Sequence, residues 1–323
     1  MHEKPGTQCA GGGILGHVGD TPLVPLRRLA AGLATPVLVK CEHLNPGGSV
    51  KDRIAVAIAD DAEARGLLRP GMTIVEATAG NTGVGLALVA AARGYRLVCV
   101  LPEKMSADKR AALATLGAEV IVTPNAAPSH PDNFRRVAER LAGERGWFLA
   151  DQFNNPANVE AHVRTTAAEI LAQTGGVIGA FVAGAGTGGT ITGVGRVLKR
   201  ACPKVQVVLA DPVGSGLAQW VESGTLGPDG AYAVEGIGAS EPPGNLDRSV
   251  IDAAERVSDA ESFKMARRLI AEEGLLVGGS AGTNVAAALR LAARGGLEGP
   301  VVTVLPDSWD RYRSKPWMQP GSG

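Results

Sequence analysis

One lysine of this chain is placed where its amine could react. Lys51 follows the glycine pair of NPGGSVKDRIA and opens an apolar run that predicts a helix over 51–65. The positive end of a helix dipole and apolar neighbours both disfavour an ammonium ion, so we expect the pKa of Lys51 to be lowered. A partly neutral lysine is a nucleophilic amine that can form a Schiff base with a carbonyl group. The alternative is an ordinary surface lysine, for which a helix start is an unfavourable place.

Two glycine-rich loops could each hold an anion. The segment GAGTGGT, residues 184–190, ends a predicted strand and opens a helix, and Thr187 and Thr190 add hydroxyl donors that suit a terminal phosphate. The segment TAGNTG, residues 78–83, has the same setting and could bind a carboxylate, while Asn81 could donate to a ring oxygen. An ordinary turn with a threonine helix cap is the alternative for this second loop.

A third glycine-rich segment completes the set. GGSAG, residues 278–282, presents Ser280, whose hydroxyl could meet a ring nitrogen or could merely cap the next helix. A reactive amine, a phosphate cradle, a carboxylate cradle and a hydroxyl for a ring nitrogen together match the needs of pyridoxal 5′-phosphate. We therefore predict that cofactor.

The phosphate loop also permits a different cofactor. GAGTGG satisfies the GxGxxG pattern of dinucleotide-binding proteins, and Asp211 follows at the end of the next predicted strand. An NAD-dependent oxidoreductase is therefore the main competing hypothesis, and a catalytically silent binding protein is another. Lys51 has no role in either of them.

Short apolar strands alternate with helical segments along most of the chain, which indicates parallel βαβ units with helices on both faces of a sheet. The predicted fold class is α/β. The predicted strands are 36–40, 72–77, 95–102, 118–124, 179–185, 205–212 and 299–307, and the predicted helices are 51–65, 82–93, 106–115, 157–173, 189–201, 260–273 and 282–294. Gly66, Gly94 and Gly117 stand where three of these helices should stop in a left-handed conformation.

Bulk composition argues against several functions. The 323 residues carry 32 basic and 32 acidic side chains, so there is no electrostatic reason to expect nucleic acid or an anionic membrane as a partner. No apolar run approaches the roughly 18 residues that span a bilayer. The four cysteines and five histidines are scattered, so neither a disulfide framework nor a metal site is expected. Residues 1–16 are expected to be a flexible leader rather than a secretory signal, and the expected location is the reducing cytoplasm.

Several segments, taken in order, resemble one enzyme family. They are NPGGSVKDRIA, EATAGNTGVGLALVAA, DQFNNPAN, GTGGTITGVGR, EGIG and GGSAG. They closely resemble the cysteine synthase and cystathionine β-synthase family of fold-type II pyridoxal-phosphate enzymes, and the resemblance extends from about Gly19 to Trp317.

The resemblance implies a tryptophan synthase β-like fold of two three-layer αβα domains with the cofactor between them. Residues 1–42 together with 156–323 would form the larger, cofactor-binding domain. Residues 43–155 would form the smaller domain, which carries the reactive lysine and the carboxylate loop. Members of the family are usually homodimers, so a homodimer is expected here.

Position by position, the resemblance implies a role for each motif residue. Lys51 would be the Schiff-base lysine, Asn81 the partner of the ring hydroxyl, and Ser280 the partner of the pyridine nitrogen. The phosphate cradle would consist of Gly186, Thr187, Gly188, Gly189 and Thr190. The substrate carboxylate would be held by Thr78, Ala79, Gly80, Asn81 and Thr82 together with Gln152, and Gly236 would line the site.

The implied reaction is β-replacement on an activated L-serine. Because a hydroxyl such as that of Ser280 stabilises a pyridinium less than a carboxylate does, loss of a β substituent is favoured over transamination. Lys51 would remove the Cα proton, the β substituent would leave to give an α-aminoacrylate, and a nucleophile would add at Cβ. We expect a cysteine synthase that converts O-acetyl-L-serine and sulfide to L-cysteine.

Departures from the family pattern leave the second substrate open. Ala79 stands where family members commonly have serine, and EGIGASEPPGNLD lacks an aromatic residue of the related segments. GGSAG, LPEKMS, ADPVGS and the LPDS-to-WM tail are instead similar to the catalytic core of cystathionine β-synthases. The alternatives are condensation of serine or activated serine with homocysteine, another nucleophile in a secondary pathway and, more distantly, a serine or threonine dehydratase. No pair of regulatory domains and no haem-binding leader is expected.

Overall fold

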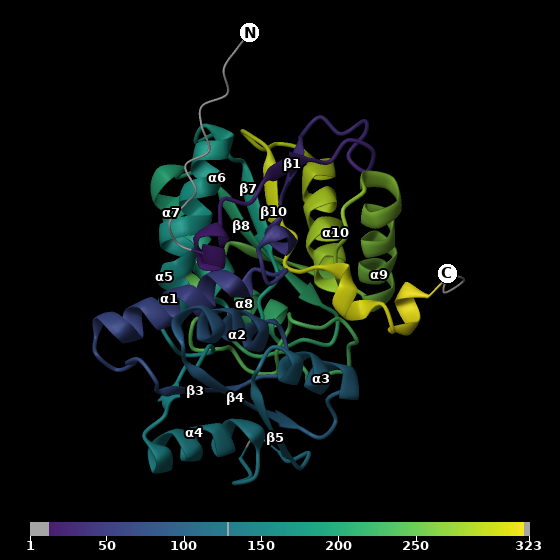
Figure 1. The fold of residues 1–323 in the computed structure, drawn as a ribbon. Helices are drawn as coiled ribbons and strands as arrows, with labels where there is room; N and C mark the ends of the chain where they lie inside the picture. Colours follow the sequence, from purple (N-terminus) through teal and green to yellow (C-terminus); the bar gives the residue numbers. More distant parts are fainter. Residues whose placement is uncertain (1–12, 128, 320–323) are drawn as a thin grey trace.

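Two β-sheets organise the chain (Figure 1). The computed structural model describes residues 13–127 and 129–319. Within these residues the smaller sheet has the strand order β5-β4-β3-β6 and is parallel throughout. The larger sheet has the order β1-β2-β10-β7-β8-β9, in which β1 runs antiparallel to β2 and the other pairs are parallel. The predicted α/β class is confirmed.

The smaller sheet is covered by helices on both faces. Its strands are β3 (Thr73–Ala77), β4 (Arg96–Pro102), β5 (Glu119–Thr123) and β6 (Phe148–Leu149). Ile74 and Leu97 pack against α1 (Lys51–Ala64) and α2 (Asn81–Arg93), and Leu113 of α3 (Ala107–Thr115) joins the same core. On the other face, Val75 and Val98 pack against Val137 of α4 (Phe134–Arg145).

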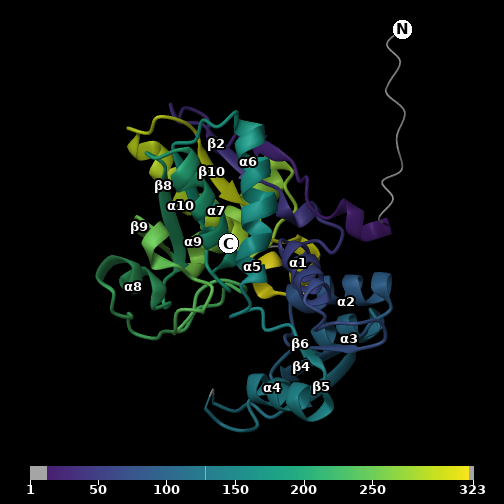
Figure 2. The ribbon, with the colours of Figure 1, turned by 90° about the vertical axis from the view of Figure 1, so that its left-hand side faces the viewer.

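The larger sheet is layered in the same way (Figure 2). Its strands are β1 (Leu23–Pro25), β2 (Val37–Lys40), β7 (Ala180–Ala183), β8 (Gln206–Pro212), β9 (Ala253–Val257) and β10 (Val301–Val304). One core contains α9 (Asp259–Arg268) and α10 (Gly279–Arg294), and the opposite core contains α6 (Ala167–Thr174), α7 (Gly189–Ala201) and α8 (Leu217–Ser223). Short 3₁₀ turns at Gly13–His17, Glu42–Leu44, Arg248–Val250, Trp309–Tyr312 and Pro316–Met318 complete the chain with the helix α5 (Ala157–Ala161).

Most predicted elements are present, and the differences have local causes. The predicted helix 157–173 is interrupted by a π-helical turn at His162–Thr166, and the predicted helix 260–273 ends in another at Leu269–Glu273. β1, β6, β9, α4 and α8 are not among the predicted elements. β1 and β6 are too short to show a pattern, and α4 is polar on most of its surface. Positive φ angles at Gly66, Gly94 and Gly117 confirm the three helix stops.

The expected flexible leader is wrong for its last residues. Gly13–His17 forms a 3₁₀ turn, and Leu15 packs on the core between α1 and α2, because an apolar residue at this point can cover the ends of both helices. Residues 1–12 of that segment, including Cys9 and His2, lie outside the described part of the chain. All strands of the smaller sheet come from the predicted smaller domain, whose boundaries at 43 and 155 stay a prediction.

Some observations bear on the excluded functions. No helix in the described ranges is long and apolar enough to cross a membrane. Likewise, no cluster of three histidine, cysteine or acidic side chains with the spacing of a metal site occurs among residues 13–127 and 129–319. Cys41, Cys99 and Cys202 are free thiols.

Candidate active site

A cleft of about 2080 Å³ lies between segments that belong to the two sheets. A small hollow of about 30 Å³ adjoins it and shares Lys51, Gly186 and Thr187 with it. Together they are lined by the predicted site residues Lys51, Thr78, Ala79, Gly80, Asn81, Thr82, Gln152, Gly186, Thr187, Gly188, Thr190, Gly236 and Ser280. The structure therefore brings motifs from the whole chain into one space.

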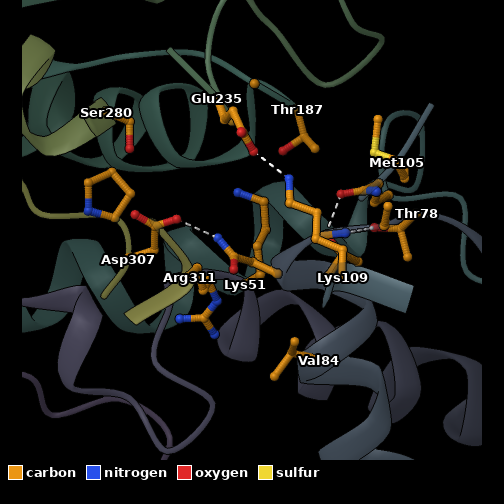
Figure 3. Close-up of a pocket in the computed structure, with 18 of the residues that line it drawn as sticks. Lys51, Thr78, Val84, Met105, Lys109, Thr187, Glu235, Ser280, Asp307 and Arg311 are labelled. Atoms are coloured by element: carbon orange, nitrogen blue, oxygen red, sulfur yellow. Dashed lines mark hydrogen bonds and ion pairs between the residues drawn. The ribbon is translucent and has the colours of Figure 1, made fainter. Parts of the chain in front are cut away.

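Lys51 is the first residue of α1 and faces this space (Figure 3). Its Nζ atom makes no hydrogen bond or ion pair with any described residue, although the Asp307 carboxylate is near enough to act on its charge. Burial lowers the pKa of the Lys51 amine, and the negative charge of Asp307 opposes part of that change. The predicted lowering is confirmed, with burial as its largest cause. An unpaired amine of this kind can act as nucleophile and as base.

A C-terminal strap, residues 306–312, holds the loop before Lys51. The backbone N–H of Ser308 donates to the carbonyl of Gly48 over 3.0 Å, and the Arg311 guanidinium donates to the same oxygen over 3.1 Å. Gly48 has a φ of +75°, which is why glycine is needed at this turn. The strap thus fixes the start of α1, and with it the origin of the lysine side chain.

The carboxylate loop precedes α2, which begins at Asn81 with Gly80 as its cap residue. No side chain caps this helix, so the alternative of a threonine cap is wrong. The Thr82 hydroxyl donates instead to Oε1 of Gln152 over 2.5 Å, which connects two of the residues predicted to hold the carboxylate. The carboxamide of Asn81 donates to Oδ2 of Asp307 over 2.7 Å. Asp307 lies on the strap and was not among the residues predicted from sequence.

The phosphate cradle lies between β7 and α7. Gly188, with a φ of +84°, caps α7, and a Cβ atom at Gly186 would overlap the carbonyl oxygen of Gly236. The chain therefore needs bare backbone at both positions, which leaves amide groups accessible at the positive end of the helix. Gly189 lines neither cavity: it leaves room for the Asn158 side chain behind the cradle.

Two buried side chains hold the threonines of the cradle. Asn158 donates from Nδ2 to the Thr187 hydroxyl over 3.0 Å. His162, in the π-helical turn, contacts the Thr190 hydroxyl through Nε2 at 3.2 Å and the Thr166 hydroxyl through Nδ1 at 2.9 Å. Burial and the nearby positive charges of Arg53 and Lys51 lower the pKa of His162, so its ring is neutral. Sequence patterns gave no signal for either side chain, because they approach the loop from a separate element.

Ser280 lies in the first turn of α10, which is capped by Gly278 rather than by a side chain. The interpretation of Ser280 as a helix cap is therefore wrong, because the helix begins before it. Its hydroxyl is buried on the cleft wall and makes no hydrogen bond with the described residues. It is available to a ring nitrogen.

Asp211, the acidic residue of the dinucleotide hypothesis, lines neither cavity. It is fully buried, and its Oδ2 accepts a hydrogen bond from the backbone of Ala218 over 2.8 Å at the start of α8. An acid committed to a helix start is not available to a ribose hydroxyl. This position therefore gives the dinucleotide hypothesis no support.

The mouth of the cleft carries a charged cluster that the sequence did not reveal. Glu235 forms one ion pair with Lys109 of α3 (Figure 3) and another, over 2.5 Å, with Lys315. The two lysines lower the pKa of the Glu235 carboxyl against the effect of its burial. The cluster joins the smaller-sheet side of the cleft to the larger-sheet side, so it can influence which molecules enter.

The family comparison decides between the two cofactor hypotheses. Residues 14–307 match the family described as pyridoxal-phosphate dependent enzyme. The chain belongs to this family. It is similar to cystathionine β-synthase of Oryctolagus cuniculus, with 50% identity over 307 residues that make up 94% of this chain and 55% of that protein. It is also similar to cysteine synthase of Staphylococcus aureus strain N315, with 44% identity over 300 residues, 93% of this chain and 94% of that protein.

Solved structures agree with this assignment. The structure of O-ureido-L-serine synthase has a TM-score of 0.86 and 44% identity, and the match covers 94% of each chain. A lysine-to-alanine mutant of that enzyme with O-ureido-L-serine bound has a TM-score of 0.83 and 45% identity, covering 94% of this chain and 92% of the other. The fold-type II architecture is confirmed. The chain spans 54–60% of the length of the four cystathionine β-synthases that it matches.

The cleft of this pyridoxal-phosphate enzyme fits its cofactor. An unpaired amine at Lys51, an unpaired hydroxyl at Ser280 and bare backbone at Gly186 and Gly188 have the chemistry that an aldehyde, a pyridine nitrogen and a phosphate respectively require, so these residues would hold the cofactor.

Proposed function

We propose that this chain catalyses β-replacement on an activated L-serine and that it is a cysteine synthase using O-acetyl-L-serine and sulfide. The observation that carries the proposal is the unpaired Lys51 amine in one cleft with two anion cradles and the Ser280 hydroxyl. The cysteine synthases of similar length, matched over 94% of their chain, support this choice of substrates.

Each part of the cleft has a defined task in this reaction. Bound pyridoxal phosphate supplies the electron sink that makes the Cα proton of an amino acid acidic. The amine of Lys51, whose pKa is lowered by burial, takes that proton and can return it. The amides of residues 78–82 and the Thr78 hydroxyl, with Gln152, hold the substrate carboxylate so that Cα faces Lys51, while the Thr82 hydroxyl holds Gln152. Ser280 meets the ring nitrogen without placing a negative charge beside it, which favours loss of the β substituent.

A second nucleophile deserves a test because specific matches favour it. The cystathionine β-synthases are up to 50% identical over the whole cleft-forming region, which supports homocysteine as the nucleophile. The likeness to O-ureido-L-serine synthase supports a nitrogen- or oxygen-containing nucleophile of a secondary pathway.

Cytoplasmic location and a homodimer remain part of the proposal, and the free thiols of the described cysteines support a reducing compartment.

The experiment has two stages. Purified protein with added pyridoxal phosphate is expected to show a visible absorption band, which O-acetyl-L-serine, O-phospho-L-serine or L-serine should change if it is the first substrate. Sulfide and homocysteine are then supplied together, and mass spectrometry of the products identifies the nucleophile. Lys51→Ala should lose the band and lower turnover roughly 10²–10⁴-fold. Lys264→Ala, a change at an exposed lysine on α9, is the matched control.

Different outcomes test the role of the lysine, the identity of the nucleophile and the type of reaction. A colourless protein, or a Lys51→Ala variant that keeps both band and turnover, would refute the cofactor role of the lysine. A product containing homocysteine as the preferred nucleophile would replace sulfide and leave the β-replacement proposal intact. A keto acid as the only product would identify a dehydratase.

A further inference from the structure

A buried carboxylate joins the two sides of the cleft. Asp307 lies directly after β10 of the larger sheet, and Asn81 opens α2 beside the smaller sheet. The Asn81 carboxamide donates from Nδ2 to Oδ2 of Asp307 over 2.7 Å. Figure 3 draws this contact next to Lys51. The proposed reaction assigns no role to Asp307.

The chemistry of the two groups determines how the carboxamide is turned. An ionised carboxylate accepts hydrogen bonds and donates none, so the nitrogen of Asn81, rather than its oxygen, must face Asp307. The nitrogen carries two hydrogens, and only one is used in this contact. The second N–H is available to an acceptor in the cleft. Without the carboxylate, a rotation of the carboxamide could exchange its oxygen and nitrogen.

Asp307 is itself rigidly held. The hydroxyl of Tyr312 donates to Oδ2 over 2.7 Å, and the backbone N–H of Gly278 donates to the Asp307 carbonyl over 3.1 Å. Its backbone also pairs with Ser49, two residues before Lys51. The side chain is 3% exposed, which leaves it no freedom to follow a moving partner. A fixed acceptor can therefore impose its geometry on the carboxamide.

The buried position of the Asp307 carboxyl is unfavourable, and packing alone does not account for it. Burial raises the pKa of the Asp307 carboxyl, whereas hydrogen bonds from Tyr312 and Asn81 and the positive charges of Arg311 and Lys51 lower it. Its Oδ1 is buried and has no hydrogen-bond partner among the described residues. A buried carboxylate with one unpaired oxygen is destabilising in itself. Its presence beside the predicted cofactor partner therefore points to a role in the site.

We infer that Asp307 is a positioning residue, which orients the Asn81 carboxamide so that its free N–H is presented to the ring oxygen of the cofactor. The inference rests on the proposed role of Asn81 as partner of that oxygen. Asp307 lies on the strap, which follows β10 of the larger sheet, whereas Asn81 belongs to the smaller-sheet side of the cleft. A residue from one side therefore orients a hydrogen-bond donor from the other.

The test measures cofactor binding without any substrate. Apoprotein is titrated with pyridoxal phosphate, and the affinity and the wavelength of the visible band are recorded for Asn81→Ala, Asp307→Ala and the double variant. Each single variant is expected to weaken binding about fivefold, the effect of one lost hydrogen bond, and to shift the band in the same direction. The double variant should match either single variant, because both remove the same contact.

Two further variants separate orientation from folding. Asp307→Asn keeps the size of the side chain but replaces the acceptor-only carboxylate with a group that also donates, so it no longer fixes the direction of the Asn81 carboxamide and should shift the band in the same direction as Asp307→Ala. Tyr312→Phe removes the other hydrogen bond to Asp307 and leaves the Asn81 contact in place, so it should shift the band little. Thermal unfolding of each apoprotein shows whether the fold is intact, and Asp307→Asn carries the test if Asp307→Ala does not fold.

The result that overturns the inference differs from the result that overturns the function. If Asn81→Ala shifts the band and Asp307→Ala does not, or if the two effects add, Asp307 does not orient Asn81. An unshifted band in folded Asp307→Asn also refutes orientation. If neither alanine variant shifts the band, the assignment of Asn81 to the ring oxygen is wrong. None of these outcomes depends on which nucleophile the enzyme uses.

Discussion

Asn158 donates a hydrogen bond from its carboxamide to the Thr187 hydroxyl over 3.0 Å. The same nitrogen donates to the backbone carbonyl of Gln152 over 2.7 Å, so one buried side chain contacts both the phosphate cradle and the carboxylate side of the cleft. Because Thr187 accepts from Asn158, its own proton is free to point into the cleft. A change at Asn158 therefore affects both the phosphate cradle and the carboxylate side of the cleft.

The first prediction concerns this side chain. Asn158→Ala leaves Thr187 without its fixed donor and should weaken pyridoxal-phosphate binding about tenfold, within the range for a lost buried hydrogen bond. Fluorescence titration of the apoprotein measures the change. Asn154→Ala, at an exposed asparagine four residues earlier in the same segment, should leave the affinity unchanged. Equal affinities in the two variants would show that Asn158 only fills space.

The contrast between Lys51 and Asn158 shows what sequence patterns can and cannot reveal. Lys51 and the glycine loops were predictable because the reactive group, the helix start and the bare backbone are neighbours in the chain. Asn158, His162 and Asp307 reach the same site through packing of distant elements, and an isolated polar residue in a helix or loop carries no local signal. Likewise, β2, β3, β4, β5, β7, β8 and β10 were recognisable by their apolar runs, whereas the two-residue strand β6 has too few residues to show any pattern.

The second prediction compares alanine substitutions at two glycines that differ in the space around their Cβ positions. Gly186→Ala should abolish cofactor binding and lower the melting temperature, because its Cβ would overlap the backbone oxygen of Gly236, which cannot move aside cheaply. Gly143→Ala, in the last turn of α4 with nothing near its Cβ position, should raise stability by roughly 0.5–1 kcal/mol. Thermal unfolding of both proteins checks the signs. A stable, cofactor-binding Gly186→Ala protein would contradict the assigned cradle.

The third prediction concerns Ala79 in the carboxylate loop. Ala79→Ser adds a hydroxyl to the lining of the cleft and should lower the apparent KM for the amino-acid substrate while leaving pyridoxal-phosphate affinity unchanged. Steady-state kinetics and cofactor titration on the same preparation separate the two effects. An unchanged KM would remove any importance of this position for substrate binding.

The fourth prediction concerns acid stability. Burial lowers the pKa of His43 to about 4, against an opposing effect of Glu42. Protonation therefore favours the unfolded chain, and His43 destabilises the fold progressively as the pH falls from about 6.5 to about 4, by up to roughly 3 kcal/mol. Above that window both states hold a neutral ring, and the effect vanishes.

Other titrating groups also change the folding stability in this pH range, so the experiment compares the stability of wild type with that of a His43 variant. Burial raises the pKa of Asp52 to about 6 and of Glu76 to about 7, and these carboxyls favour the fold as the pH falls. Urea unfolding of wild type and His43→Leu at pH 7 and pH 5 should show the variant gaining stability relative to wild type at the lower pH. His130→Leu, at an exposed histidine, should show no such gain. A pH-independent difference for His43→Leu would refute the linkage.

The position of β10 in the larger sheet has a consequence for how the protein is made. β10 (Val301–Val304) lies between β2 and β7, so the sheet cannot close until the chain as far as Val304 has left the ribosome. The smaller sheet uses only strands from Thr73 to Leu149 and can assemble earlier during synthesis. Until then β2 and β7 expose unpaired edges, a state that is prone to aggregation and that chaperones would have to protect. Because the strap follows β10, the reactive lysine is locked in place only after residues 306–312 have been made.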